Sequence, residues 1–234
     1  MKKGYSISVW LLFVLTILLP VGVLLTALFG YSFDLGNYSV FAICTAIVSL
    51  FITVLVLSGK LDGISKAGKV LFALLPFLST ANAAFCIFKC SSGTDEIVVA
   101  ICMFACTVFA FIQAVKLGKP VALKAVGIVL ASIAVLPVFA LTLLPFGEDT
   151  VTQSLVSPQG GYYYAEVVAV NQGALGGDTV VYVYENKGVD LLAFRIYKSP
   201  ERIYMGEWGE FEDMNIYWKD EQCLVINSAE YSVK

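Results

Sequence analysis

The chain of 234 residues contains no histidine, and that absence removes several kinds of chemistry. Ser-His and Cys-His nucleophile pairs both need an imidazole as the general base. Histidine is also the commonest metal ligand among side chains and the usual proton carrier near neutral pH. We therefore predict that the protein is not an enzyme, and we expect no catalytic residues, no metal site and no cofactor.

Charged residues are also scarce, at 14% against 59% hydrophobic residues, and the mean hydropathy is +0.82. Such a composition lies far from that of soluble proteins and predicts a membrane protein with several spans. Residues 1–147 hold nine Lys and four acids (+5), whereas residues 148–234 hold six Lys or Arg and fourteen acids (−8). The acidic part would be repelled by nucleic acid and by anionic lipid, so we expect no nucleic-acid partner.

Apolar runs with short polar connections fill the first part of the chain, and each can cross a hydrocarbon layer about 30 Å thick. The predicted spans are five: residues 5–30, 40–57, 70–88, 97–115 and 125–146. The apolar core of the first, residues 9–29, is longer than the roughly 7–15 residues of a signal peptide, so we expect an uncleaved anchor. Prolines at 20, 76 and 137 predict kinks in three of these helices.

The lysines give the spans an orientation. Only Lys89 falls on one side, and eight fall on the other, namely Lys2, Lys3, Lys60, Lys66, Lys69, Lys116, Lys119 and Lys124. Because cytoplasmic loops carry the excess of Lys and Arg, this bias predicts a cytoplasmic N-terminus. Five crossings then predict a multi-pass plasma-membrane protein whose C-terminal region is extracytoplasmic.

That C-terminal region reads as β-structure. Residues 162–170 and 179–184 are rich in Tyr, Val and Thr, and Gly, Asn and Asp residues between them supply turn chemistry. Further strands are expected at 191–197, 202–208, 215–219 and 222–227. The predicted fold class is thus membrane α-helical, with five transmembrane helices in residues 1–147, a linker at 148–156, and a small C-terminal all-β antiparallel domain at 157–234.

An ordered series of short motifs runs through the predicted β domain. It opens as SPxGxY from Ser157 to Tyr162, continues as NxGA from Asn171, and closes with Trp218, Lys219, Asp220 and a final Ile-Asn at Asn227. The series resembles a family of Gram-positive bacterial membrane-anchored proteins with a small β domain. The resemblance covers residues 157–231 and implies the fold and the domain boundary. It implies no activity, because none is assigned to the family.

The chain departs from that family in having Gly161 where a charged residue is common, and in having more spans. The opening motif alone also looks like a turn of a β-propeller blade. A propeller needs several repeated sheets, however, and the chain has no internal repeat.

Two segments of the predicted β domain could bind a ligand or partner: the Gly-rich loop at 171–178 and the aromatic, acidic stretch at 204–218. The alternatives are a plain connection and a solvated acidic loop. The candidate residues are Asn171, Gly173, Asp178, Tyr204, Trp208 and Phe211. Besides the lipid bilayer, we expect an envelope protein or a ligand as partner, in an accessory, sensory or immunity-like role.

Two other functions stay open. A membrane thiol-redox protein could use Cys86 with Cys90, and Cys102 with Cys106, because a spacing of four places each pair on one helix face. No CxxC pair is present, and packing between helices is the alternative role.

A small-solute permease could instead centre on Asn82, which lies beside Ser79 and Thr80 in the third predicted span. Polar residues of this kind also join helices to one another. No ionisable residue lies near the middle of a predicted span, which disfavours ion-coupled transport.

Overall fold

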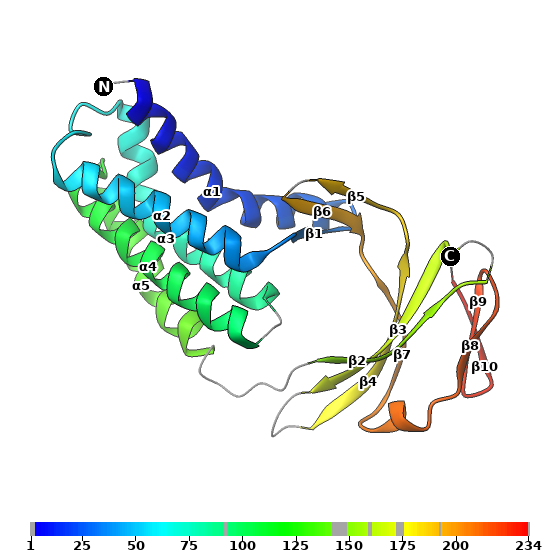
Figure 1. Ribbon diagram of the computed structural model, residues 1–234. Helices are drawn as coiled ribbons and strands as arrows, with labels where there is room; N and C mark the ends of the chain where they lie inside the picture. The colour runs from blue at the N-terminus through cyan, green and yellow to red at the C-terminus, as the bar shows by residue number, and fades with distance from the viewer. Residues whose placement is uncertain are drawn as a thin grey trace. The chain divides into compact units, whose positions relative to one another are not determined.

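The computed structural model describes residues 3–90, 93–141, 149–158, 161–171, 176–191 and 193–233. The chain divides into two compact units. The helical unit comprises Met1–Leu25 and Leu35–Leu144, and the β unit comprises Thr26–Asp34 and Pro145–Lys234. Figure 1 shows the helices gathered in the first and the strands in the second.

The helices match the predicted apolar runs. They are α1 (Lys3–Leu28), α2 (Tyr38–Leu57), α3 (Lys66–Lys89), α4 (Gly93–Leu117) and α5 (Val121–Leu141). Within the described residues, α1 to α4 are long and apolar enough to cross a membrane, and α5 contributes a shorter apolar stretch, Val121–Val135. Pro20, Pro76 and Pro137 lie inside α1, α3 and α5. The predicted helical part is confirmed at this level.

Side-chain caps fix where two of these helices begin. Asn37 Oδ1 accepts a hydrogen bond from the Val40 amide at 2.8 Å, and Ser65 Oγ accepts one from the Gly68 amide at 3.2 Å. Each cap satisfies an amide that has no partner within its own helix.

Small residues bring α3 and α5 together. A methyl group placed on Gly127 of α5 would lie 2.5 Å from the carbonyl oxygen of Ala73 on α3. The two backbones therefore approach closely, and close packing of this kind is a main source of association between helices in lipid.

The β unit contains three antiparallel sheets. Sheet B has the order β2-β3-β4-β7, sheet C the order β10-β9-β8, and sheet A the order β1-β6-β5. The strands are β1 (Tyr31–Leu35), β2 (Thr150–Val156), β3 (Tyr163–Asn171), β4 (Gly177–Glu185), β5 (Gly188–Leu191), β6 (Phe194–Lys198), β7 (Glu201–Glu207), β8 (Ile216–Asp220), β9 (Cys223–Ile226) and β10 (Ala229–Ser232). The predicted C-terminal antiparallel β region is confirmed.

Alternation along the strands builds the core between sheets B and C. Ala165, Val167 and Val181 on sheet B pack against Leu224 and Ile226 on sheet C, and all five are buried. Because side chains alternate across a strand, one face of β3 and β4 supplies this core while the other face is left outside it.

Three expectations about this region need correction. The segment expected to be a linker, residues 148–156, contains β2, because Leu155 packs on the core and the backbone pairs with β3. The single strand expected at 191–197 is split, and Leu191 pairs with Phe194 across a hairpin. The short strand β10 was not expected, since only Tyr231 in it packs on the core.

The largest difference from the prediction is β1, which lies between the first two helices yet belongs to sheet A. Phe33 of β1 stacks on Phe194 of β6 with ring centroids 5.1 Å apart. The Ser199 amide donates to the Gly30 carbonyl at 3.0 Å, and the Tyr197 hydroxyl donates to Asp34 Oδ2. The loop after α1 therefore forms part of the β unit.

We expect Gly127→Ala to lower the thermal stability of the full chain in detergent, because the added methyl would force the α3 and α5 backbones apart. Overpacking of this kind costs about 1–3 kcal/mol. Gly63→Ala is the matched control, since a methyl there meets no atom within 4 Å. Equal melting temperatures for the two variants, measured by thermal unfolding, would contradict the close approach.

Candidate functional site

The first motif of the series, SPxGxY, is hydrogen-bonded through Ser157 and Tyr162 to Glu221 in the turn between β8 and β9. Ser157, 4% exposed, donates from Oγ to Glu221 Oε1 at 2.6 Å and accepts a hydrogen bond from the Tyr163 amide at 3.2 Å. Glu221 Oε1 also accepts from the Tyr162 amide at 3.2 Å. The SPxGxY opening thus ties the β2–β3 connection to the turn between β8 and β9. Its serine has a structural role.

The later motif residues also hold backbone in place. Trp218 Nε1 donates to the Leu155 carbonyl at 3.2 Å. The side-chain oxygen Oδ1 of Asn227 accepts a hydrogen bond from the Asn215 backbone amide at 3.0 Å. The side-chain nitrogen Nδ2 of Asn227 donates to Glu210 Oε1 at 2.9 Å. Asn227 has φ +48°, a left-handed conformation that asparagine tolerates better than most residues. These residues mark the fold and do not form an exposed site.

Of the candidate binding residues, Asn171 and Asp178 lie at one end of sheet B. Asn171 pairs with Gly177 across β3 and β4, and Asp178 pairs with Glu207 on β7. The Asn171 amide donates to Asp149 Oδ1 at 3.2 Å. Gly173 lies outside the described residues.

Trp208 and Phe211 join this sheet end. A methyl on Gly177 would lie 2.2 Å from the Trp208 ring, so the indole packs directly over the glycine. Phe211 meets Trp208 edge-on with centroids 5.8 Å apart. Thr179 Oγ1 donates to the Glu207 carbonyl at 2.8 Å and accepts from the Phe211 amide at 3.3 Å. We call Gly177, Trp208 and Phe211 the Trp208 platform.

Tyr204 does not belong to the platform. Its ring packs at the edge of the core, edge-on to Tyr231 with centroids 6.1 Å apart. Its hydroxyl donates to Glu210, and this bond to a carboxylate, with burial, raises the pKa of Tyr204 to about 12. Through this hydrogen bond Tyr204 is attached to the first residue of the short 3₁₀ helix η2 (Glu210–Glu212).

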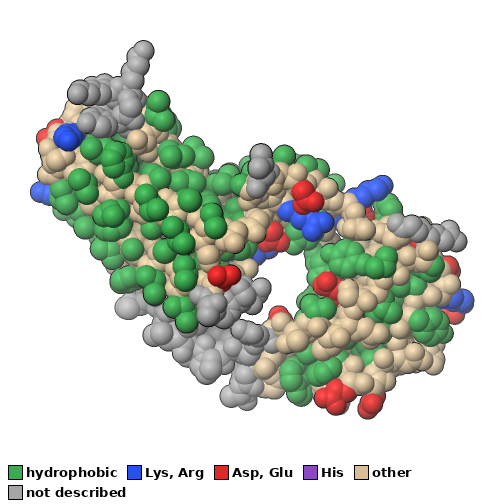
Figure 2. Space-filling view, in the orientation of Figure 1, with side chains coloured by type: hydrophobic (Ala, Val, Ile, Leu, Met, Phe, Trp, Pro, Cys, Tyr) green, Lys and Arg blue, Asp and Glu red, His purple; other side chains and the backbone are tan. Residues whose placement is uncertain are grey.

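The surroundings of the Trp208 platform are acidic. Residues 203–218 contain no Lys or Arg, and four acidic residues at this sheet end form what we call the acidic rim: Asp178, Glu207, Glu212 and Asp213. Asp178 and Glu207 pair across β4 and β7, and because side chains alternate along a strand they lie on the sheet face opposite Gly177. Glu212 and Asp213 follow Phe211 along the chain. Figure 2 shows acidic side chains at this end of the β unit. Trp208 is 49% exposed. An open indole ring at an acidic end of a sheet is suited to binding a cation, because the ring face attracts positive charge and the nearby carboxylates add attraction at longer range. The spacing of residues along the sequence could not reveal that Gly177 makes room for the indole.

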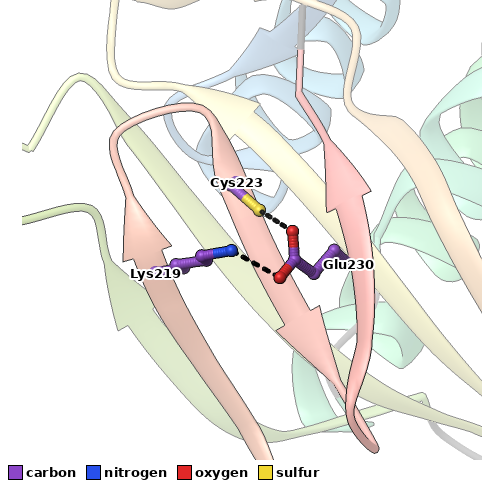
Figure 3. Close-up of polar contacts among 3 residues, drawn as sticks. All are labelled: Lys219, Cys223 and Glu230. Atoms are coloured by element: carbon purple, nitrogen blue, oxygen red, sulfur yellow. Dashed lines mark hydrogen bonds and ion pairs between the residues drawn. The ribbon is translucent and has the colours of Figure 1, made fainter.

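Three polar side chains on sheet C contact one another, namely Lys219, Cys223 and Glu230 (Figure 3). Cys223 Sγ lies 3.8 Å from Glu230 Oε2, and the other oxygen of Glu230 pairs with Lys219 Nζ at 2.5 Å. Desolvation and the Glu230 charge raise the pKa of the Cys223 thiol above its ordinary value. A reactive thiol needs a lowered pKa, so this arrangement does not activate the sulfur.

Most cysteines of the helical unit are buried. Cys86 on α3, Cys90 at the C-cap of α3 and Cys106 on α4 are buried, Cys102 is half-buried and Cys44 on α2 is exposed, and all six cysteines of the chain are free. Among the described residues no group of three or more Cys, Asp and Glu is placed to hold a metal ion. The thiols fill space as small apolar groups do.

The interior of the helical unit also contains a polar contact that the sequence analysis missed. Gln113 of α4 is fully buried and donates to the Ser49 carbonyl at 3.1 Å and to Thr53 Oγ1 at 2.8 Å on α2. Gln113 lies close to the end of the predicted span at 97–115, so its position in the sequence does not indicate a buried contact. It joins two helices.

Asn82, the centre of the permease hypothesis, is buried on α3, and its nearest polar partner is Met103 Sδ of α4 at 3.9 Å. The space enclosed by Thr16, Ser49, Ser79 and neighbouring side chains leaves about 0 Å³ for a water-sized molecule. A water needs roughly 10–15 Å³ of such volume. This part of the described interior therefore offers no path in the conformation seen.

No protein family, curated protein or solved structure matches the chain in the comparisons with known proteins. The family resemblance of the motif series therefore stays a prediction.

Replacing Ser157 with Ala should destabilise the full chain by about 1–3 kcal/mol, because the buried Tyr163 amide would lose a side-chain acceptor. Ser154→Ala is the control, since Ser154 is exposed on the neighbouring strand β2. Thermal unfolding in detergent measures the difference. A melting temperature as high as that of the control would show that Ser157 is not structural.

Proposed function

We propose that the protein is a multi-pass plasma-membrane protein that holds its β unit outside the cell, where the Trp208 platform binds a Lys- or Arg-rich segment of another envelope protein. The observation that carries the proposal is the 49% exposed indole of Trp208, which packs over Gly177 at the end of sheet B that carries the acidic rim. The role is accessory, sensory or immunity-like, by binding and without catalysis.

The distribution of side chains in the helical unit supports membrane insertion. Large apolar side chains point outward, as for Trp10 (60% exposed) and Ile133 (68%). Polar Thr16, Ser49 and Gln113 are buried. In water such a surface would be unfavourable, whereas in lipid it is the expected one.

The place of β1 supports five crossings. β1 lies in the loop between α1 and α2, and it shares a sheet with β5 and β6 from the C-terminal region. The α1–α2 loop and the C-terminal region must then lie on the same side of the membrane. Three further crossings, by α2, α3 and α4, would end on the opposite side, so α5 must cross as well. The lysine distribution makes the shared side extracytoplasmic.

The acidic rim and the indole would act together on a cationic partner. A Lys or Arg side chain over a Trp ring gains about 0.5–2 kcal/mol. The carboxylates add attraction at longer range, which salt screens within about 10 Å at ordinary ionic strength. Because Gly177 and Phe211 already hold the ring, binding would cost little side-chain entropy.

Reporter fusions test the topology. A phosphatase that is active only outside the cell should be active when fused after the C-terminal Lys234 and inactive when inserted at Gly118 between α4 and α5. The reason is that five crossings place these two points on opposite sides. Phosphatase activity at Gly118, or its absence at the C-terminus of a stably expressed fusion, would contradict the proposal.

Binding by the platform is tested on the full chain in zwitterionic nanodiscs, with a fluorescent ten-lysine peptide as the probe. Trp208→Ala should weaken binding about tenfold or more, as expected for a central aromatic residue. Tyr217→Ala is the matched control, because Tyr217 on β8 is also 49% exposed.

A ten-glutamate peptide should not bind, and added salt should weaken the lysine peptide. If the two variants bind the lysine peptide equally, the platform is not the site. If neither charge is preferred, the acidic rim does not select the partner.

A further inference from the structure

Sheet A has one apolar face, and this face is uncovered at its outer edge. Phe33 of β1 stacks on Phe194 of β6, which places both rings on one side of the sheet. Leu191 pairs with Phe194 and Val189 pairs with Ile196, so the apolar face continues onto β5. Phe33 is 4% exposed, whereas Val189 is 60% and Leu191 49% exposed.

The other face of sheet A is polar. Asp34 and Tyr197 are hydrogen-bonded there, and Arg195 pairs with Asp190 at 3.0 Å. The sheet is therefore amphipathic. On its polar side the side chains are paired with one another, and on its apolar side Val189 and Leu191 of the edge strand β5 are exposed. An exposed apolar edge strand is unusual in water unless something covers it.

Chain connectivity ties this sheet to the end of α1. Only Phe29 and Gly30 separate the last residue of α1, Leu28, from Tyr31 at the start of β1. Phe29 is 77% and Tyr31 47% exposed. Strands in a sheet lie about 4.8 Å apart, so β5, two strands from β1, is about 10 Å from it. The polar headgroup layer on one side of a bilayer is roughly 5–7 Å thick.

The local charge also differs from that of the β unit as a whole. Residues 186–200 contain Lys187, Arg195 and Lys198 against Asp190 alone, a net charge of +2. Arg195 is paired with Asp190, however, and Lys198 with Glu185 just before this segment, so most of the positive charge is neutralised. Since residues 148–234 sum to −8, the remainder carries −10. The β5–β6 hairpin is thus close to neutral in an acidic domain, so anionic headgroups would repel it far less than the rest of the domain.

We infer that the β5–β6 hairpin lies in the interface of the bilayer, with Val189 and Leu191 at the boundary of headgroups and acyl chains. The occupant of the exposed apolar face is lipid of the membrane that α1 enters. The overall acidity of residues 148–234 predicts repulsion by such a surface, but the hairpin itself is close to neutral because Arg195 and Lys198 are paired with Asp190 and Glu185. This inference rests on the proposed membrane insertion and is independent of the Trp208 platform.

The test uses the full chain at one copy per nanodisc, in lipid that contains phosphatidylglycerol. An environment-sensitive fluorescent amino acid replaces Leu191, or Tyr217 as the control, because both side chains are 49% exposed. A nitroxide near the top of the acyl chain should quench the probe at 191 and leave the probe at 217 unchanged. Aqueous iodide should quench the probe at 217 and leave the probe at 191 largely unchanged.

Val189→Asp with the probe at 191 should reverse this pattern, since a carboxylate opposes entry into the interface. Equal iodide quenching at 191 and 217, without lipid quenching, would overturn the inference. So would protection at 191 that needs two copies per disc, because a second chain would then cover the face. Binding of the lysine peptide in the zwitterionic discs reports on the Trp208 platform separately, because that lipid does not attract the peptide, so the two proposals can fail independently.

Discussion

The pairing of β1 with β6 is the constraint on which the chain's organisation depends. It joins five residues from the loop after α1 to strands more than 150 residues later, through the Phe33–Phe194 stack and the bonds at Gly30 and Asp34. An isolated strand of five residues cannot persist alone, because its backbone groups would be left without partners. The β unit is therefore completed only when the helical part supplies this strand, and its attachment is by two chain connections, the α1–α2 loop and residues 142–149.

The double connection makes β1 covalently continuous with both α1 and α2. In the proposed membrane setting, a load on the β unit would pass through β1 to the ends of α1 and α2. A sensory role needs such a connection, since a signal can cross the membrane only through an element whose position differs between two states.

The residues that identify the β unit and the residues that offer binding are different sets. Three motif residues have side chains that are hydrogen-bonded to other parts of the β unit, namely Ser157, Trp218 and Asn227. These polar groups are therefore already engaged within the fold. The Trp208 ring contacts Gly177 and Phe211, and about half of the residue's surface is exposed and can contact a partner. The motif residues thus stabilise the fold, while the proposed site consists of residues whose placement depends on a glycine on a neighbouring strand.

The helices were predictable from the sequence because long apolar runs have few other stable structures. The strand at 162–170 was nearly as clear, since it is rich in Tyr and Val. The strands β1 and β10 and the turn that splits β5 from β6 were not. Such short strands acquire their partners from distant segments, and local pattern carries little information about them. Tyr204 was grouped with Trp208 and Phe211 for the same reason, although its hydroxyl is held by Glu210 at the core edge.

The sequence by itself determined the apolar helices, the acidic β region that follows them, and the exclusion of histidine chemistry, because these depend on composition and on local periodicity. Only the tertiary structure decided that residues 31–35 belong to the β unit and that Gly177 seats Trp208. It also decided that Val189 and Leu191, on the edge strand of sheet A, are exposed on the apolar face of that sheet. Each of these depends on contacts between residues far apart in the chain, and local propensity cannot specify them.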